Sequence, residues 1–152
     1  MDQLIRTNSS NKDFQLLVEQ LDADLAERDG AEHAFYQPFN SIQALQNVVM
    51  MYHNDTPVSC GAFKPLSPTT VEIKRMFTLP TKRGMGYASL VLKELEAWAT
   101  ALHYSIIVLE TGKRQPEAIA LYQKNGYEII PNYGQYIGIE NSVCFEKKIE
   151  PK

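Results

Sequence analysis

VEIKRMFTLPTKRGMGYASLVLKELEAWATAL, residues 71–102, carries the clearest pattern of secondary structure in this chain. Residues 71–77 carry the apolar positions of a buried strand, with Thr70 before them and Thr78 and Pro80 after them. From Ala88 onward, apolar residues recur at helical spacing, at Val91, Leu92, Leu95, Trp98, Ala99 and Leu102. We therefore predict a strand, a short basic loop with two glycines, and an amphipathic helix.

The loop before this helix has the composition of an anion-binding site. The first turn of a helix leaves backbone N–H groups without partners and carries a partial positive charge. Gly84 and Gly86 would let an anion approach those groups closely, and Lys82 and Arg83 add formal charge. The sequence therefore predicts that a phosphate or pyrophosphate binds here.

Three interpretations of this loop compete. A Walker P-loop requires G-x-x-x-x-G-K-[ST], which no segment of the chain matches. A dinucleotide fingerprint requires G-x-G-x-x-G directly after a strand and an acid after the next one. Glu110 supplies such an acid, but Ser89 occupies the position of the third glycine, and residues 78–83 separate the strand from the glycines. On the loop alone, an ordinary basic strand–helix connection remains open.

Two motifs in this region resemble the GNAT superfamily of N-acetyltransferases. Arg83-x-x-Gly86-x-Ala88 fits the family pattern R/Q-x-x-G-x-G/A. The segment AIALYQKNGY, residues 118–127, is similar to the family's A-x-x-L-Y-x-K-x-G-[FY], and it lies in an expected helix (116–125) that follows an expected strand (105–111). The resemblance covers residues 48–149 and looks like that of the single-domain bacterial members.

This resemblance implies a GNAT-like acyl-CoA N-acyltransferase fold of the mixed α/β class. Its central sheet is mostly antiparallel and flanked by helices, and its fourth and fifth strands are parallel and splay apart to admit the cofactor. The rest of the chain fits this plan, with expected strands at 4–6, 48–53, 58–64, 127–130 and 143–148 and a first helix at 12–28.

Two segments of the chain allow two interpretations each. The acidic residues at the end of the first helix, Asp22, Asp24, Glu27 and Asp29, form either a solvated face or a field that draws a cationic amine. Residues 30–45 are expected to be loop with one short helix, and under the resemblance they cap the acceptor pocket. Their aromatic side chains either line that pocket or cover the sheet.

Composition limits the other classes of function. A length of 152 residues fits a single domain over residues 1–152, and 44% apolar with 22% charged residues is typical of soluble globular proteins. The net charge of −3 argues against nucleic-acid binding. No apolar stretch approaches the roughly 20 residues of a membrane span, and the first residues do not resemble a signal peptide.

The cysteines and histidines indicate neither disulfides nor metal. Cys60 and Cys144 are too few for a disulfide framework, so we expect reduced thiols and a cytoplasmic protein. His33, His53 and His103 have no metal-ligand spacing with either cysteine, so no metal is expected.

The resemblance implies acetyl-CoA as co-substrate. Its pantetheine arm would pair with the backbone of the strand as an added half-strand, and its pyrophosphate would take N–H groups from the glycine loop. The residues predicted to bind it are Met76, Phe77, Thr78, Arg83, Gly84, Met85, Gly86, Tyr87, Ala88, Ser89, Gln115 and Ala118. Gln115 stands where many family members carry Asn.

Two residues are predicted to be catalytic. Tyr122 lies where the family's general acid commonly lies; otherwise it is a helix-core residue with a hydrogen-bonded hydroxyl. Glu72 precedes Arg83 at the offset of the base glutamate in histone-acetylating members, and a partly buried carboxylate can accept an ammonium proton. A solvated face for Glu72, water as the base, and Glu110 as the second candidate remain open.

The sequence thus predicts a transferase that moves an acetyl group from acetyl-CoA, by direct attack, to a primary amine of a small molecule. Acetylation of a protein N-terminus or lysine, and a non-catalytic acyl-CoA sensor, are the alternatives. No nucleic acid or membrane is expected as a partner, and exposed sheet edges make a homodimer reasonable.

Overall fold

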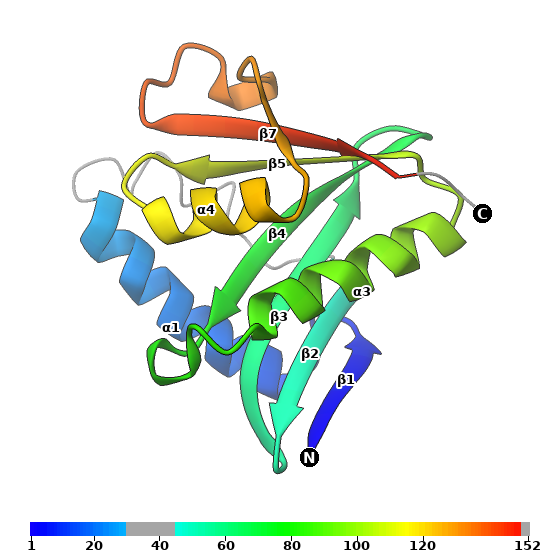
Figure 1. Ribbon diagram of the computed structural model, residues 1–152, viewed down its shortest axis with the longest axis vertical. Helices are drawn as coiled ribbons and strands as arrows, with labels where there is room; N and C mark the ends of the chain where they lie inside the picture. The colour runs from blue at the N-terminus through cyan, green and yellow to red at the C-terminus, as the bar shows by residue number, and fades with distance from the viewer. Residues whose placement is uncertain (30–44, 150–152) are drawn as a thin grey trace.

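A computed structural model describes residues 1–29 and 45–149 of the chain. Its centre is a seven-stranded mixed sheet in the order β1-β2-β3-β4-β5-β7-β6 (Figure 1). Neighbouring strands are antiparallel except for β4 and β5, which are parallel. The strands are β1 (Asp2–Thr7), β2 (Asn47–His53), β3 (Thr56–Pro65), β4 (Thr70–Thr78), β5 (Ile106–Gly112), β6 (Glu128–Ile130) and β7 (Ser142–Lys148).

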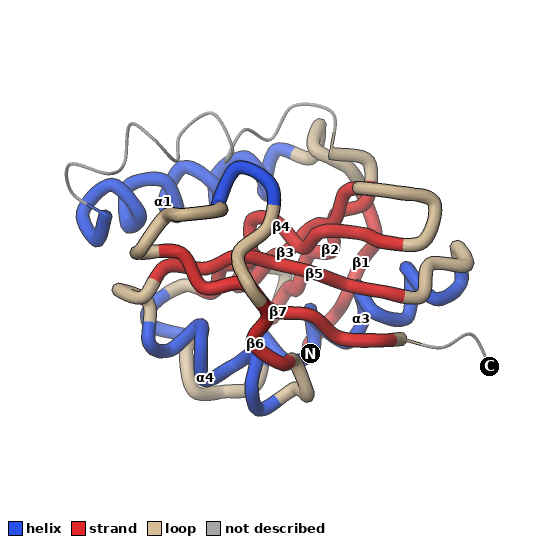
Figure 2. Tube along the Cα trace, turned by 90° about the horizontal axis from the view of Figure 1, so that it is seen from above, coloured by secondary structure: helices blue, strands red, loops and turns tan. Residues whose placement is uncertain are grey.

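The helices cover both faces of this sheet. Helix α1 (Lys12–Asp29) lies on one face, and α3 (Tyr87–Ala101) and α4 (Pro116–Lys124) lie on the other (Figure 2). Two 3₁₀ turns complete the fold: η3 (Pro80–Lys82) follows β4, and η4 (Gly134–Tyr136) lies on the α1 side. No helix in the described part of the chain is long and apolar enough to cross a membrane.

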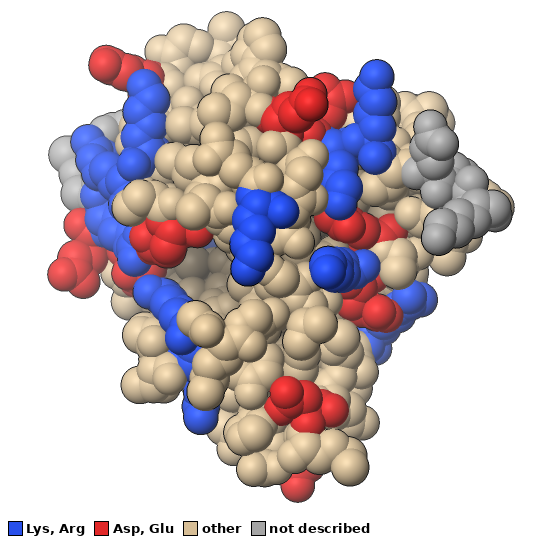
Figure 3. Space-filling model, in the orientation of Figure 1, with Lys and Arg blue, Asp and Glu red and all other residues tan. Residues whose placement is uncertain are grey.

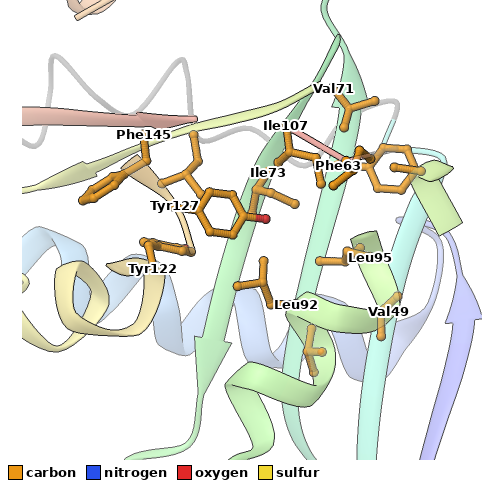
Figure 4. Close-up of a cluster of buried hydrophobic side chains, with 14 of the residues drawn as sticks. Val49, Phe63, Val71, Ile73, Leu92, Leu95, Ile107, Tyr122, Tyr127 and Phe145 are labelled. Atoms are coloured by element: carbon orange, nitrogen blue, oxygen red, sulfur yellow. The ribbon is translucent and has the colours of Figure 1, made fainter. Parts of the chain in front are cut away.

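Each face of the sheet has its own hydrophobic core because side chains alternate along a strand. The α1 face packs residues of α1 against β2 and β3, with Phe14 and Met50 fully buried. The α3 and α4 face is the larger core, and Figure 4 shows Ile73, Leu92 and Leu95 converging within it. A sheet covered on both sides leaves a ligand only the edges and gaps between strands.

The parallel pair β4 and β5 provides such a gap. Their pairing extends only from Thr70–Ile106 to Glu72–Val108, after which the two strands diverge (Figure 1). Beyond that point β5 continues to pair with β7, whereas residues 73–78 of β4 have no partner strand on the β5 side within the described ranges. The splayed parallel strands that the family resemblance implied are therefore confirmed.

A β-bulge bends β4 at the point of divergence. Arg75 has a φ of 60°, and the register between β3 and β4 shifts between Cys60 and Ala62. Bulges increase local twist and turn a strand away from its neighbour. Gly61 lies opposite the bulge, where a Cβ would come within 2.3 Å of Sδ of Met76, so only glycine fits there without rearrangement.

The predicted elements agree with the structure apart from small shifts at their ends. The organising helix begins at Tyr87, one residue earlier than predicted, and the second hairpin strand begins at Thr56. The strand predicted at 127–130 begins at Glu128, because the N–H of Tyr127 instead bonds the carbonyl of Tyr122 and closes the turn after α4. Of the predicted loop at 30–45, all but Leu45 lies outside the described residues.

Candidate active site

A pocket of about 410 Å³ opens where β4 and β5 diverge. Its walls come from α1, β4, the β4–α3 loop, the end of β5 and α4, and Tyr136 adds a side chain from η4. Figure 3 shows the surface hollowed, beside Lys and Arg side chains, in the region where Figure 1 places α4 and the β4–α3 loop. The pocket therefore joins the predicted anion site to the gap in the sheet.

The anion-binding end of the pocket is the uncapped start of α3. Gly86 is the residue before the helix, with a φ of 85°, and no side chain of the described residues caps the first turn. Gly84 has a similar φ of 81°, and among residues 1–29 and 45–149 no atom lies within 4 Å of a Cβ placed at either glycine. The described residues thus leave open space in front of helix-terminal N–H groups, as binding of a phosphate requires.

A positive side chain is fixed beside this helix terminus. Nε of Arg83 donates to the carbonyl oxygen of Thr78 at 3.0 Å, and its guanidinium lies 5.7 Å from the ring centre of Phe77. Its other end lies 4.0 Å from the carboxylate of Asp24 on α1. Lys82 also lines the pocket, so two cationic residues of the β4–α3 loop border it.

An ion-pair bridge ties α1 to α4 along the pocket. Arg28 pairs with Asp24 at 3.1 Å and with Glu117 at the start of α4, and it donates to the carbonyl oxygen of Arg114. Both carboxylates line the pocket. The arginines compensate these two negative charges, which would otherwise repel an anionic ligand.

Tyr122 lies deep in the pocket wall on α4. It is buried, and its ring packs against Tyr127 and Phe145 (Figure 4). Burial, with the charge of Glu110, raises its pKa, so the phenol stays protonated at neutral pH. None of the described residues forms a hydrogen bond with the Tyr122 hydroxyl. The alternative interpretation, a core tyrosine with a hydrogen-bonded hydroxyl, therefore has no supporting contact among these residues.

The two candidate bases occupy different environments. Glu110 lines the pocket, and its carboxylate accepts a hydrogen bond from the hydroxyl of Ser142 at 2.7 Å. Glu72 does not line it: its side chain is only 2% exposed, and it accepts a 2.6 Å hydrogen bond from the hydroxyl of Tyr133. A solvated face for Glu72, one of the alternatives, is therefore wrong.

Lys74 and Tyr136 are pocket residues that the sequence analysis missed. Nζ of Lys74 lies 3.3 Å from the Tyr136 hydroxyl and 3.3 Å from Oε1 of Glu72. Burial lowers the pKa of Lys74, and the attraction of Glu72 opposes this only in part. A signal existed for the lysine, because Lys74 and Glu72 alternate on one face of the strand, but nothing local connected Tyr136 to it.

The comparisons with known proteins agree with this geometry. The family model described as Acetyltransferase (GNAT) family matches residues 14–127. A curated relative, IAA acetyltransferase of Azospirillum brasilense, is 32% identical over 141 residues, which cover 88% of each chain.

The chain belongs to the GNAT family. It is an acetyltransferase of that family, a class of enzyme that uses acetyl-CoA as acetyl donor. Among solved structures, a candidate acyl-CoA N-acyltransferase from Klebsiella pneumoniae is similar with a TM-score of 0.82 and 27% identity, covering 98% of each chain. A GNAT acetyltransferase from Elizabethkingia anophelis, solved with acetyl-CoA bound, shares the fold with a TM-score of 0.68 and 18% identity, covering 97% of each chain.

Most residues predicted to bind the cofactor of this GNAT protein line the pocket. They are Met76, Phe77, Thr78, Arg83, Gly84, Gly86, Tyr87, Ala88, Ser89, Gln115 and Ala118. Met85 lies outside the lining, with 61% of its surface exposed. The structure thus gathers eleven predicted contacts around one cavity, together with Tyr122, while Glu72 stays apart from it.

Neither a cluster of metal-ligating side chains nor a reactive thiol is found among the described residues. No group of three His, Cys, Asp or Glu side chains among residues 1–29 and 45–149 could hold a metal ion. Cys60 and Cys144 are both unpaired and buried. Burial raises the pKa of Cys60 to about 12 and that of Cys144 to about 11, which disfavours the nucleophilic thiolate.

Proposed function

We propose that this GNAT acetyltransferase transfers the acetyl group of acetyl-CoA directly to the primary amine of a small molecule. One observation carries the proposal: a single pocket connects the uncapped N-terminus of α3 to Tyr122 and Glu110 through the gap between β4 and β5. A long, bent cofactor with a pyrophosphate near one end and a thioester at the other needs this combination.

The residues present fit acetyl-CoA. The pyrophosphate would take N–H groups around Gly84 and Gly86, where open space faces the helix terminus, with Arg83 alongside. The pantetheine arm carries amide groups that can pair with β4 at residues 76–78, where no described strand pairs on the β5 side. Bound there, the cofactor supplies an activated acetyl group as a thioester.

The side chains at the far end of the pocket have the chemistry for aminolysis of that thioester. An amine must lose a proton in order to attack. We assign Glu110, which lines the pocket, as the group that accepts this proton. As the N–C bond forms and the C–S bond breaks, the departing thiolate needs a proton, and the Tyr122 phenol can donate it. Glu72 then acts by holding Lys74 and Tyr133 rather than by touching the substrate.

The acceptor class rests on similarity and on the pocket. The Azospirillum brasilense relative is named for a small-molecule reaction, IAA acetylation. The cavity of about 410 Å³ also has the size of a small-molecule site. Two further properties stay predictions. The cysteines, which form no disulfide, are consistent with a cytoplasmic protein. A homodimer is the predicted oligomeric state.

A thiol-release assay tests the proposed activity. Purified protein and acetyl-CoA are mixed with a panel of small primary amines and, separately, with peptides that carry a free N-terminus or a lysine. Amine-dependent CoA release supports the proposal. Release with peptides alone would move the acceptor to proteins, and release with neither, despite saturable cofactor binding, would favour a sensor.

A further inference from the structure

We propose that Lys74 is itself an acetyl acceptor, so that the protein acetylates this lysine from bound acetyl-CoA. This inference rests on the proposed function, because it needs the cofactor in the same pocket. The modified lysine would be an internal competitor of the small-molecule amine.

The position of Lys74 on β4 brings its amine to the catalytic end of the pocket. It precedes the bulge at Arg75 and the strand edge at residues 76–78 that we assign to the pantetheine arm. Lys74, Glu110, Tyr122 and Tyr136 all line the one cavity. A rigid strand therefore holds a primary amine in the compartment that receives the thioester.

The surroundings of Lys74 favour loss of its proton. Only 10% of the side chain is exposed, and this desolvation lowers its pKa. Glu72 and Glu110 act in the opposite direction, and Lys64, whose Nζ lies 3.8 Å from Glu72, acts with the desolvation. The lysine that faces the thioester thus has a larger neutral fraction than an exposed one.

The step is balanced with the groups in place. The neutral amine of Lys74 attacks the thioester carbonyl, the N–C bond forms, and the C–S bond breaks to release CoA as a thiol. The proton that the nitrogen loses can pass to Glu72, whose Oε1 lies 3.3 Å from Nζ. The proton that the departing sulfur needs comes from Tyr122, as in the proposed reaction.

Other lysines near the pocket provide internal controls. Lys82 and Lys124 line it at the loop and on α4, and neither lies on the splayed edge of β4. Lys64 shares Glu72 with Lys74, but its side chain is 44% exposed and lies outside the lining. Geometry therefore predicts modification of Lys74 alone.

Acetylation of Lys74 would limit the enzyme's own activity. The acetamide is neutral, so buried Glu72 would lose its nearest cation, and the added group would fill part of the pocket. We expect modified protein to bind acetyl-CoA but to turn over amines more slowly than unmodified protein.

Mass spectrometry of the intact full chain tests this inference. Protein whose initial modification state is known is incubated with acetyl-CoA without any amine, then weighed and mapped by peptides. We expect one added acetyl group, on Lys74, suppressed by excess CoA. Lys74→Arg keeps the charge and should remove the modification, whereas Lys64→Arg should leave it.

Calorimetric measurement of acetyl-CoA binding to the same sample distinguishes failure of self-acetylation from failure of the proposed function. Binding without any modification of Lys74 would overturn self-acetylation and leave the proposed function standing. Equal acetylation of Lys64, Lys82 and Lys74, unaffected by CoA, would mean that acetyl-CoA reacts with exposed lysines without catalysis. That result would also overturn self-acetylation. Absence of binding would overturn the proposed function, and the inference with it.

Discussion

Glu110 on β5 and Tyr122 on α4 face one pocket, and the carboxylate of Glu110 helps to raise the pKa of the Tyr122 phenol. A negative charge beside a phenol makes loss of the phenolic proton harder. The two groups are therefore suited to opposite tasks at one pH, with the carboxylate accepting a proton and the phenol donating one.

Replacing Tyr122 with phenylalanine should lower kcat by about 100-fold, because general-acid catalysis of thiolate departure is lost. The affinity for acetyl-CoA should be unchanged, as measured by calorimetry. Tyr127→Phe is the matched control: its ring lies 5.7 Å from that of Tyr122, but its hydroxyl donates to Glu96. That variant should lose stability and keep kcat, and equal kcat values for the two variants would contradict the assignment.

The raised pKa of Tyr122 also predicts the pH profile of kcat. A general acid is active while protonated, so a pKa raised above the ordinary 10.0 moves its alkaline loss of activity to higher pH. We expect kcat to show no fall from this group between about pH 7 and pH 9. An alkaline limb in that range that disappears in Tyr122→Phe would show that the pKa of the phenol is lowered rather than raised.

Glu110→Gln should chiefly lower kcat, whereas Glu72→Gln should chiefly lower the stability of the fold. Loss of the pocket carboxylate should lower kcat by about 100-fold, because general-base catalysis is lost. Loss of the Glu72 charge should chiefly destabilise the fold, by roughly 1–3 kcal/mol, since Lys74 would lose a buried partner. Melting temperatures and kcat, measured on both variants, decide this, and a larger fall in kcat for Glu72→Gln would restore it as the base.

Gly86→Asp should abolish detectable binding of acetyl-CoA, because it places a negative charge at the predicted pyrophosphate site. Gly138→Asp provides a control in the same backbone conformation: its φ is 79°, and a Cβ there would also have no neighbour within 4 Å among the described residues. Gly138 does not line the pocket. Both variants should lose about 1 kcal/mol of stability, and only the first should lose binding.

Gly61→Ala should destabilise the protein by about 1–3 kcal/mol through overpacking at the bulge of β4. The added methyl group would meet Sδ of Met76 at 2.3 Å and side chains of Leu95 and Val91 at 3.0 and 3.1 Å. Because the bulge separates β4 from β5, affinity for acetyl-CoA should fall too. An unchanged melting temperature would mean that the bulge has room to adjust.

The local parts of the fold could be predicted from the sequence. The spacing of apolar residues in 71–102 predicts β4 and α3 almost to the residue, and the glycines mark the open loop between them. The parallel pairing of β4 with β5 was expected only from the family resemblance. The pattern of apolar residues in a strand does not identify the strand with which it pairs. The bulge at Arg75 has no such signal, since a positive φ there falls on a residue other than glycine.

The site was harder to predict because its residues meet across the chain. Alternation places Glu72 on the opposite face from Val71 and Ile73, but its burial depends on Tyr133, far along the sequence. Lys74 meets Tyr136 in the same way. The loop residues and Tyr122 could be predicted because each motif lies in one short segment.

A calorimetric titration with acetyl-CoA, with NADH and ATP as comparison ligands, tests whether the pocket between β4 and β5 is an acetyl-CoA site. We expect saturable binding of acetyl-CoA in preference to both, lost in Gly86→Asp and retained in Gly138→Asp. A preference for NADH, or no binding of acetyl-CoA to the folded protein, would contradict the assignment of the pocket between β4 and β5.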